Sequence, residues 1–104
     1  MDEYQKQALE SVAITGKGID ALAHRSLGLS GEAGTVANKI KKIIRDKNGK
    51  YDKGDLEFIK ANLGDVQYYI AVLAEYFDLR LSEIAAVNLK KSAAFKAARE
   101  KYSS

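Results

Sequence analysis

The chain has no proline in 104 residues, and this absence leaves every segment free to continue as a helix. Proline breaks a helix interior because it lacks a backbone donor and its ring clashes with the preceding turn. Alanine, leucine, lysine and glutamate favour helix and are abundant here, and glycine is the only strong breaker. We therefore expect an all-α fold.

Two apolar rows repeat at helical spacing. Their members are Leu29, Ala33, Val36, Ile40 and Ile43 in the first row, and Ile59, Leu63, Val66, Ile70, Leu73 and Phe77 in the second. Steps of three and four residues place each row on one face of a helix, the usual pattern of a side that packs into a core. We expect both rows to be buried.

Polar and glycine-containing breaks divide the chain into its expected helices, and Asn48-Gly49 with a second glycine predicts a loop over 47–54. We expect helices over 2–14, 19–45 and 55–77, then a final helix capped by Ser82, with fraying over 100–104; Asp55 is the expected N-cap of the third helix. The inward residues are expected to be Tyr4, Ala8, Leu9 and Val12 in the first helix, and Leu81, Ile84, Ala85, Leu89 and Ala93 in the last.

At this length the chain is expected to form a single domain, residues 1–104, built from three to four main helices. The apolar stripes are wider than one hairpin can cover, so we expect a helical bundle completed as a homodimer or homotetramer. Cysteine is absent, no apolar run reaches the ~20 residues of a membrane span, and the start lacks a signal-peptide pattern. These features favour a cytoplasmic protein without a membrane partner.

A polar stripe runs beside each apolar row. Glu32, Thr35, Lys39 and Lys42 share one face of the second helix, and Asn62, Asp65 and Tyr69 share one face of the third. Oxygen ligands on two facing helices could hold Mg²⁺, which prefers carboxylates and is completed by water and substrate phosphates. Lysines one and two turns beyond Thr35 would then meet those phosphates. Surface positions for both acids are the plain alternative.

Other polar and aromatic residues have two interpretations each. His24 is the only histidine, so it cannot build a multi-histidine metal site, and we expect it at a core edge or pocket rim. The tyrosines Tyr68, Tyr69 and Tyr76 fit a core better than base stacking. Basic residues crowd 39–50 and 90–101, either as solvated helix faces or as phosphate contacts. With a net charge of +3, we do not expect a nucleic-acid partner.

Two longer motifs carry a family resemblance. The segments are Leu27-Gly28-Leu29-Ser30-Gly31-Glu32-Ala33-Gly34 with Lys39-Ile40-Lys41-Lys42, Asn62-Leu63-Gly64-Asp65-Val66-Gln67-Tyr68-Tyr69-Ile70-Ala71, and Asn88-Leu89-Lys90-Lys91. In order and spacing, from about Tyr4 to Lys91, the chain resembles the MazG-like nucleotide pyrophosphohydrolases. The resemblance implies an all-α oligomer that cleaves a nucleoside or deoxynucleoside triphosphate to the monophosphate and pyrophosphate with Mg²⁺, or Mn²⁺ in its place.

The resemblance also assigns roles, with two departures. The family's E-x-x-E and E-x-x-D metal pattern falls on Glu32, Thr35, Asn62 and Asp65, so two of its four carboxylates are neutral here. Glu32 and Asp65 are the implied catalytic metal ligands, with Thr35 and Asn62 as weaker partners. The implied substrate contacts are Lys39, Lys42, Tyr69, Asn88 and Lys91. Many relatives carry a basic and glycine-rich tail after this helix, whereas residues 95–104 contain no glycine here.

Fewer carboxylates should lower the affinity for a divalent ion. The site could work with one ion, could recruit a nearby acid such as Glu57, or could be inactive as a hydrolase. The alternative function is therefore a catalytically inactive, nucleotide-binding or protein-interaction member of the same fold.

Overall fold

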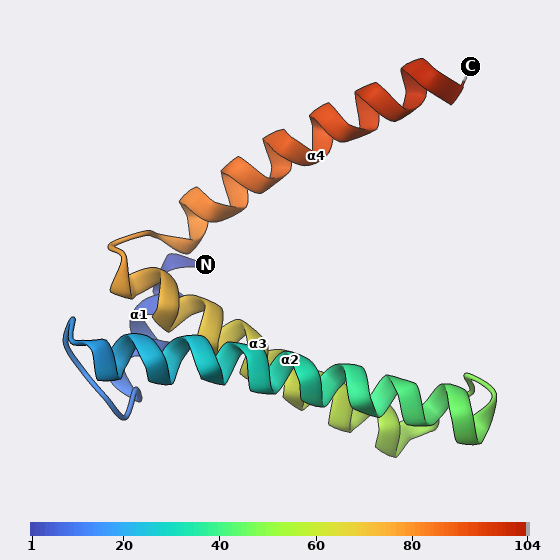
Figure 1. Ribbon diagram of the computed structural model, residues 1–104, viewed down its shortest axis with the longest axis horizontal. Helices are drawn as coiled ribbons and strands as arrows, with labels where there is room; N and C mark the ends of the chain where they lie inside the picture. The colour runs from blue at the N-terminus through green and yellow to red at the C-terminus, as the bar shows by residue number, and fades with distance from the viewer. Residues whose placement is uncertain (104) are drawn as a thin grey trace.

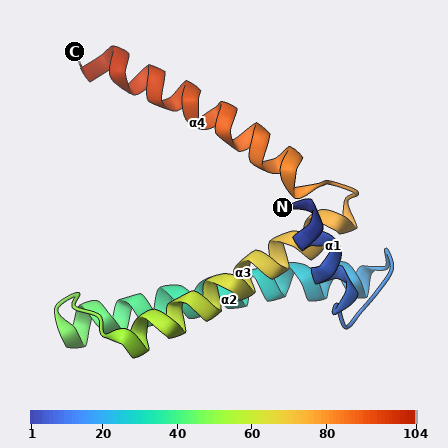
Figure 2. The same ribbon diagram turned by 180° about the vertical axis from the view of Figure 1, so that it is seen from behind.

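The computed structural model describes residues 1–103 and consists, over that range, of helices without strands. The four helices are α1 (Asp2–Glu10), α2 (Ile19–Lys47), α3 (Lys53–Tyr76) and α4 (Leu81–Ser103). Figure 1 shows α2 and α3 as a long antiparallel hairpin, with α1 beside one end of it and α4 pointing away. The view from behind, Figure 2, shows the same divergence of α4 from the hairpin. The expected all-α class is confirmed.

The core lies where α1 crosses the end of α3. Its buried residues are Ala8 and Val12, then Ala71, Val72 and Ala74 of α3, and Leu81 at the start of α4. Leu9, Tyr68 and Tyr69 pack partly buried against this cluster. Small alanines on α3 let the neighbouring helices approach closely, so this end of the hairpin is the tightly packed end.

The expected first helix is four residues too long. It ends at Glu10, because the Ser11 backbone N–H and hydroxyl both donate to the Ala8 carbonyl. Of the expected inward residues Ala8 and Val12 are buried, but Tyr4 is 36% exposed and Gln5 is buried in its place. The amide of Gln5 donates to the carbonyls of Ala71 and Leu79, which satisfies it inside the core.

The second helix runs unbroken through its glycines and ends two residues later than expected. Asn48 takes the left-handed conformation with φ 55°, and Gly49 follows with φ 79° and donates to the Ile43 carbonyl. Asparagine and glycine tolerate this conformation best, so they end the helix cleanly. The loop expected around Asn48 and Gly49 is confirmed.

The N-cap of α3 is Asp52 rather than Asp55. The Asp52 carboxylate accepts from the Asp55 backbone N–H at 2.8 Å, and the Asp55 carboxylate accepts from the Asp52 N–H at 3.1 Å. This reciprocal capping box starts the helix at Lys53. Asp55, three residues after Asp52, is therefore the second residue of the capping box and not the N-cap.

The start of α4 is held by α1. Ser82 does not cap the helix; its backbone N–H and hydroxyl donate to the Asp2 carboxylate at 2.9 and 2.6 Å. Gln5 accepts from the Leu81 N–H at 3.1 Å. The helix then continues to Ser103, so the fraying expected over 100–103 is wrong, while Ser104 lies outside the described residues.

Several residues expected in the core are exposed. They are Ala33 and Ile40 on α2, Leu63 and Ile70 on α3, Phe77 directly after α3, and Ile84, Leu89 and Ala93 on α4. The reason is that α4 leaves the hairpin after its first turn, so among the described residues α4 does not cover their faces. Leu81, Val36 and Ile43 are buried as expected.

Candidate functional site

The register of α2 against α3 is fixed by two contacts. Gly28 lies directly against the Tyr69 ring, and a β-carbon built at Gly28 would fall 2.2 Å from Tyr69 Cε1. Eleven residues further along α2, the Lys39 ammonium lies 5.1 Å from the centre of the Phe58 ring, eleven residues back along α3. The two helices are therefore antiparallel with a constant offset between these points.

The four expected ligand positions fall between those contacts and share the same offset. Glu32 is at the level of Asp65, and Thr35 is at the level of Asn62, about one turn further along the hairpin. The two carboxylates are thus on adjacent helices at one height. Glu57 lies more than two turns from Asp65 and is exposed.

The two neutral residues are bonded to their own helices. The Thr35 hydroxyl donates to the Gly31 carbonyl at 3.0 Å, and the Asn62 amide donates to the Phe58 carbonyl at 2.9 Å. Each side chain therefore points back along its own helix by one turn. The Thr35 hydroxyl oxygen and the Asn62 amide oxygen keep lone pairs that could bind a metal ion. In residues 1–103 no three histidine or carboxylate side chains gather into a group that could hold a metal ion.

The two carboxylates have different surroundings. Asp65 is exposed. Burial raises the pKa of the nearby Tyr4 phenol, and Tyr68 and the negative charge of Asp65 raise that pKa further. Glu32 is half-buried. Within the described part of the chain, neither carboxylate forms an ion pair with a basic residue, so both are available to a cation.

Lys39 forms an ion pair with Asp55, an acid that was not among the expected site residues. Its ammonium lies 2.9 Å from the Asp55 carboxylate, which Lys47 also approaches to 2.7 Å. Asp55 is 4% exposed, and the hydrogen bonds from Lys47, Lys39 and the Asp52 backbone hold the pKa of that carboxyl well below its ordinary value. Lys42 is exposed one turn further along.

The remaining expected contacts are divided between two parts of the fold. Tyr69 is half-buried in an aromatic cluster, 5.2 Å from Tyr68 and 6.0 Å from His24 between ring centres. Asn88 and Lys91 lie on the exposed part of α4 and are not brought to the hairpin positions. Lys91 and Asn88 line a hollow of about 450 Å³ with Leu79, Ile84 and Val87.

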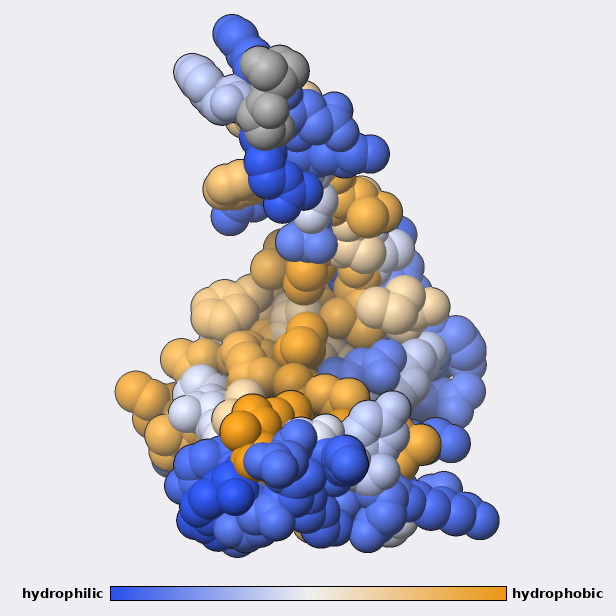
Figure 3. Space-filling model, turned by 90° about the vertical axis from the view of Figure 1, so that its right-hand side faces the viewer, coloured by the Kyte–Doolittle hydropathy of each residue, from blue (hydrophilic) through white to orange (hydrophobic). Residues whose placement is uncertain are grey.

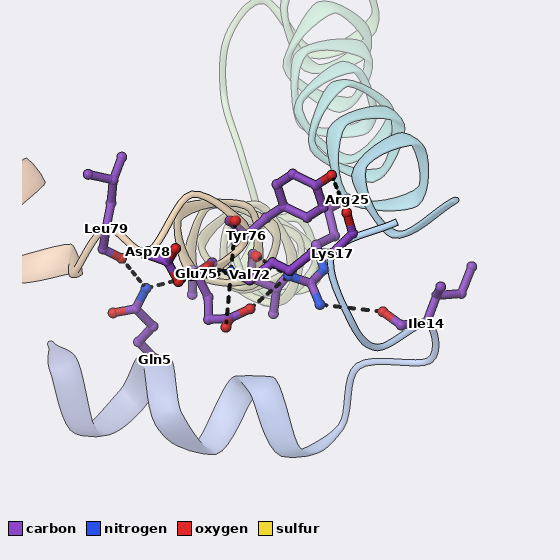
Figure 4. A network of polar contacts seen from close by, with 10 residues as sticks. Gln5, Ile14, Lys17, Arg25, Val72, Glu75, Tyr76, Asp78 and Leu79 are labelled. Carbon is purple, nitrogen blue, oxygen red and sulfur yellow. Dashed lines mark hydrogen bonds and ion pairs between the residues drawn. The ribbon is translucent and has the colours of Figure 1, made fainter. Parts of the chain in front are cut away.

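A buried arginine beside the core gave no signal in the sequence. Figure 4 shows Arg25 of α2 reaching across to the end of α3, where it donates to the Val72 carbonyl at 2.8 Å and the Glu75 carboxylate at 2.9 Å. It also donates to the Ile14 carbonyl at 3.4 Å, and its Nε has no partner among the described residues. The arginine is fully buried and joins α2, α3 and the loop between α1 and α2.

That loop is fastened to the same place by Lys17. Its ammonium donates to the carbonyls of Glu75 and Tyr76 at 2.7 and 2.8 Å and to the Asp78 carboxylate at 3.0 Å. The Tyr76 hydroxyl donates back to the Lys17 carbonyl at 2.7 Å. A lysine at a helix C-terminus satisfies free carbonyls and complements the helix dipole, so this contact is structural.

The chain is similar over most of its length to a phage protein. It is the Gene 37 protein of Mycobacterium phage L5, 41% identical over 95 residues that cover 88% of this chain and 83% of the phage protein. The chain belongs to the Gene 37 protein family. No protein-family model matches the chain, and no solved structure matches it. No described helix has the length and apolar character needed to cross a membrane.

Proposed function

We propose that the chain is a MazG-like nucleoside triphosphate pyrophosphohydrolase that acts as a homodimer or homotetramer. The observation that carries the proposal is the common height of Glu32 and Asp65 on the antiparallel helices α2 and α3. This is the arrangement that the resemblance requires of its metal-binding helices. The products are a nucleoside monophosphate and pyrophosphate.

The residues present fit a single divalent ion better than a pair. Mg²⁺ commonly takes one or two carboxylates and keeps several waters and phosphate oxygens. Glu32 and Asp65 would supply those carboxylates, and the oxygens of Thr35 and Asn62 would be neutral partners. Bound there, the ion would neutralise phosphate charge during attack of water.

The lysines have separate tasks in this proposal. Lys42 is exposed and is available to a phosphate without breaking a contact. Lys39 must leave Asp55 before it can bind one, and Lys47 then stays on Asp55 and keeps that buried carboxylate paired. Tyr69, whose ring lies against Gly28, would help to form the substrate pocket. Asn88 and Lys91 would reach the site of a second copy, because their own helix diverges from the hairpin.

A second candidate function is nucleotide binding without hydrolysis. It is favoured by the bonding of Thr35 and Asn62 to carbonyls of their own helices and by the lack of a third acid near Glu32 and Asp65 in the described residues. A pocket with fewer carboxylates repels a phosphate chain less. Such a protein would hold a nucleotide with little dependence on metal.

Pyrophosphate release from a panel of ribo- and deoxyribonucleoside triphosphates, with Mg²⁺ or Mn²⁺, tests the enzyme. Glu32→Gln and Asp65→Asn should each lower the rate at least about 100-fold, as expected when a metal ligand is lost. The control is Glu57→Gln, an exposed acid on α3 away from the site, which should retain the rate.

The double variant Thr35→Glu/Asn62→Glu separates the two candidates. If the natural chain releases no pyrophosphate and this variant does, the fold is that of the family but the natural protein is a binder. Calorimetry of nucleotide binding with and without Mg²⁺ then completes the test, since metal-independent affinity is expected only of the binder.

A further inference from the structure

The basic residues of the chain are unevenly placed, and one group of them lies on α4. Residues 86–104 hold five basic residues and one acid, while residues 1–85 hold twelve basic residues and thirteen acids. The expectation of no nucleic-acid partner rested on the net charge of +3, which hides this division. Figure 1 shows that α4 carries its group of basic residues away from the rest of the molecule.

The projecting part of α4 mixes polar and apolar side chains. Every residue from 86 to 102, which we call the arm, is exposed. Figure 3 shows the end of α4, at the top of the view, as mostly hydrophilic surface with smaller apolar areas among the hydrophilic ones. Because the two kinds of side chain are not separated onto two faces, a partner that offers only an apolar surface does not match the arm.

Cationic and aromatic side chains alternate along one side of the arm. The members of this row, which follow one another at steps of four, four and three residues, are Lys91, Phe95, Arg99 and Tyr102. Such steps keep side chains on one side of a helix, here over about 16 Å of its length. Phe95 is 69% exposed and Tyr102 is 86% exposed, so both rings are open to solvent. We call this arrangement the mixed row.

The mixed row borders an open hollow of about 310 Å³. The residues that line this hollow are Asn88, Lys91, Ser92, Phe95, Lys96 and Arg99. Its lining thus brings three cations and one aromatic ring within reach of the same ligand. Lys96 also lies 3.9 Å from the Glu100 carboxylate, but an ion pair this exposed contributes little and does not prevent the lysine from binding another anion.

We propose that the mixed row binds single-stranded nucleic acid. Bases stack on the rings of Phe95 and Tyr102, and the cations beside those rings contact phosphates. Aromatic rings combined with cations are how proteins bind single strands without sequence preference, since every base has a flat face and every linkage a negative charge. A duplex keeps its base faces stacked inside and cannot offer them to the rings.

Other anionic surfaces match the mixed row less well. Helices that lie on a membrane separate a strongly apolar face from a charged one, and the arm lacks that separation. The proposal does not depend on nucleotide hydrolysis, because Phe95, Arg99 and Tyr102 are not among the substrate contacts of the proposed enzyme. Lys91, which is one of those contacts, stays unchanged in every test below.

Fluorescence anisotropy of the full chain with a labelled oligothymidylate of about 16 nucleotides tests the proposal, at the upper end of common site sizes. Phe95→Ala should weaken binding at least about fivefold, because a stacking ring is lost. Leu89→Ala is the matched control and should retain the affinity. Leu89 is 69% exposed, as Phe95 is, but its side chain lies about 120° away around the axis of α4.

The dependence on salt tests the cations. Three phosphate contacts predict that the logarithm of the association constant falls against the logarithm of the salt concentration with a slope of about −2. Arg99→Gln should make that slope shallower by about 0.7, since one phosphate contact is lost. Lys90→Gln removes the same charge from the opposite side of α4, nine residues earlier, and should change the slope much less.

Several results would overturn the proposal. One is no binding of the oligothymidylate at low salt, and another is equal weakening by Phe95→Ala and Leu89→Ala. Equally tight binding of the same strand paired with its complement would show that the rings take no part and that only phosphates are contacted. Binding to vesicles of anionic phospholipid without binding to the oligonucleotide would assign the mixed row to a membrane surface instead.

Discussion

The ring of Tyr69 occupies the space that a side chain at Gly28 would take, with Cε1 only 2.2 Å from the position of the missing β-carbon. Gly28→Ala must therefore push Tyr69 out of its place beside His24. We expect a loss of about 1–3 kcal/mol in unfolding free energy, the usual cost of overpacking, measured by urea denaturation. Gly34→Ala is the control, because nothing lies within 4 Å of its β-carbon, and it should stabilise α2 by up to about 1 kcal/mol. Equal effects of the two would contradict the contact.

Removal of the Arg25 guanidinium should destabilise the fold strongly. Arg25→Met keeps most of the side-chain length but removes the guanidinium bonds to the carbonyls of Ile14 and Val72 and takes from Glu75 its closest cation. We expect a loss of about 3 kcal/mol, measured by chemical denaturation. Lys17→Met removes a half-exposed cation from the same cluster and should cost clearly less. If Lys17→Met proved the more harmful, the burial of Arg25 would not be the controlling feature.

Asp55 should make the fold sensitive to acid. Hydrogen bonds from Lys47 and Lys39 hold the pKa of its carboxyl below the ordinary value, so folding is favoured when the group is ionised. The resulting stabilisation is fully present above the unfolded-state pKa of about 4 and is lost as the pH falls below it. Thermal melts from pH 7 to pH 2 should show a smaller acid-induced decrease for Asp55→Asn than for the natural chain. Asp46→Asn, at an exposed pair with Arg45, should leave the pH profile nearly unchanged.

Gln5 should control the attachment of α4. Its amide bonds to Ala71, Leu79 and Leu81 join three segments, and Gln5→Leu removes the side-chain donor from two carbonyls and the acceptor from the Leu81 N–H. We expect a loss of about 2 kcal/mol, with faster hydrogen exchange of the Leu81 amide. Gln7→Leu is the control, since the exposed Gln7 side chain donates to Glu3 within α1 and not to another segment. Unchanged exchange at Leu81 in the Gln5 variant would show that other contacts hold the helix.

The helices were predictable because their signals are local. The lack of proline, the apolar steps of three and four, and the Asn48-Gly49 pair predicted four helices and the loop between α2 and α3. The error at Asp55 has a local cause as well, because either aspartate of a capping box can be mistaken for the cap. Only the reciprocal bonds distinguish Asp52 as the first residue.

Burial was harder to predict, since a helical apolar row does not say which chain covers it. Phe77 and Leu63 continue the row of α3 and yet are exposed, while Gln5 and Arg25 are buried because backbone carbonyls are available to them. Such pairings depend on tertiary position and have no counterpart in spacing. For the candidate site, spacing indicated that Glu32 and Asp65 lie on neighbouring helices, but the capture of Lys39 by Asp55 could not be foreseen.

The attachment of α4 by Asp2 and Gln5 has a mechanical consequence. A helix of 23 residues is a stiff rod about 35 Å long, so a tilt of about 10° at its base displaces its far end by about 6 Å. Asp2 and Gln5 of α1 thus hold the point about which α4 would tilt. Small adjustments among the first few residues of the protein would be magnified into large movements of its last ones.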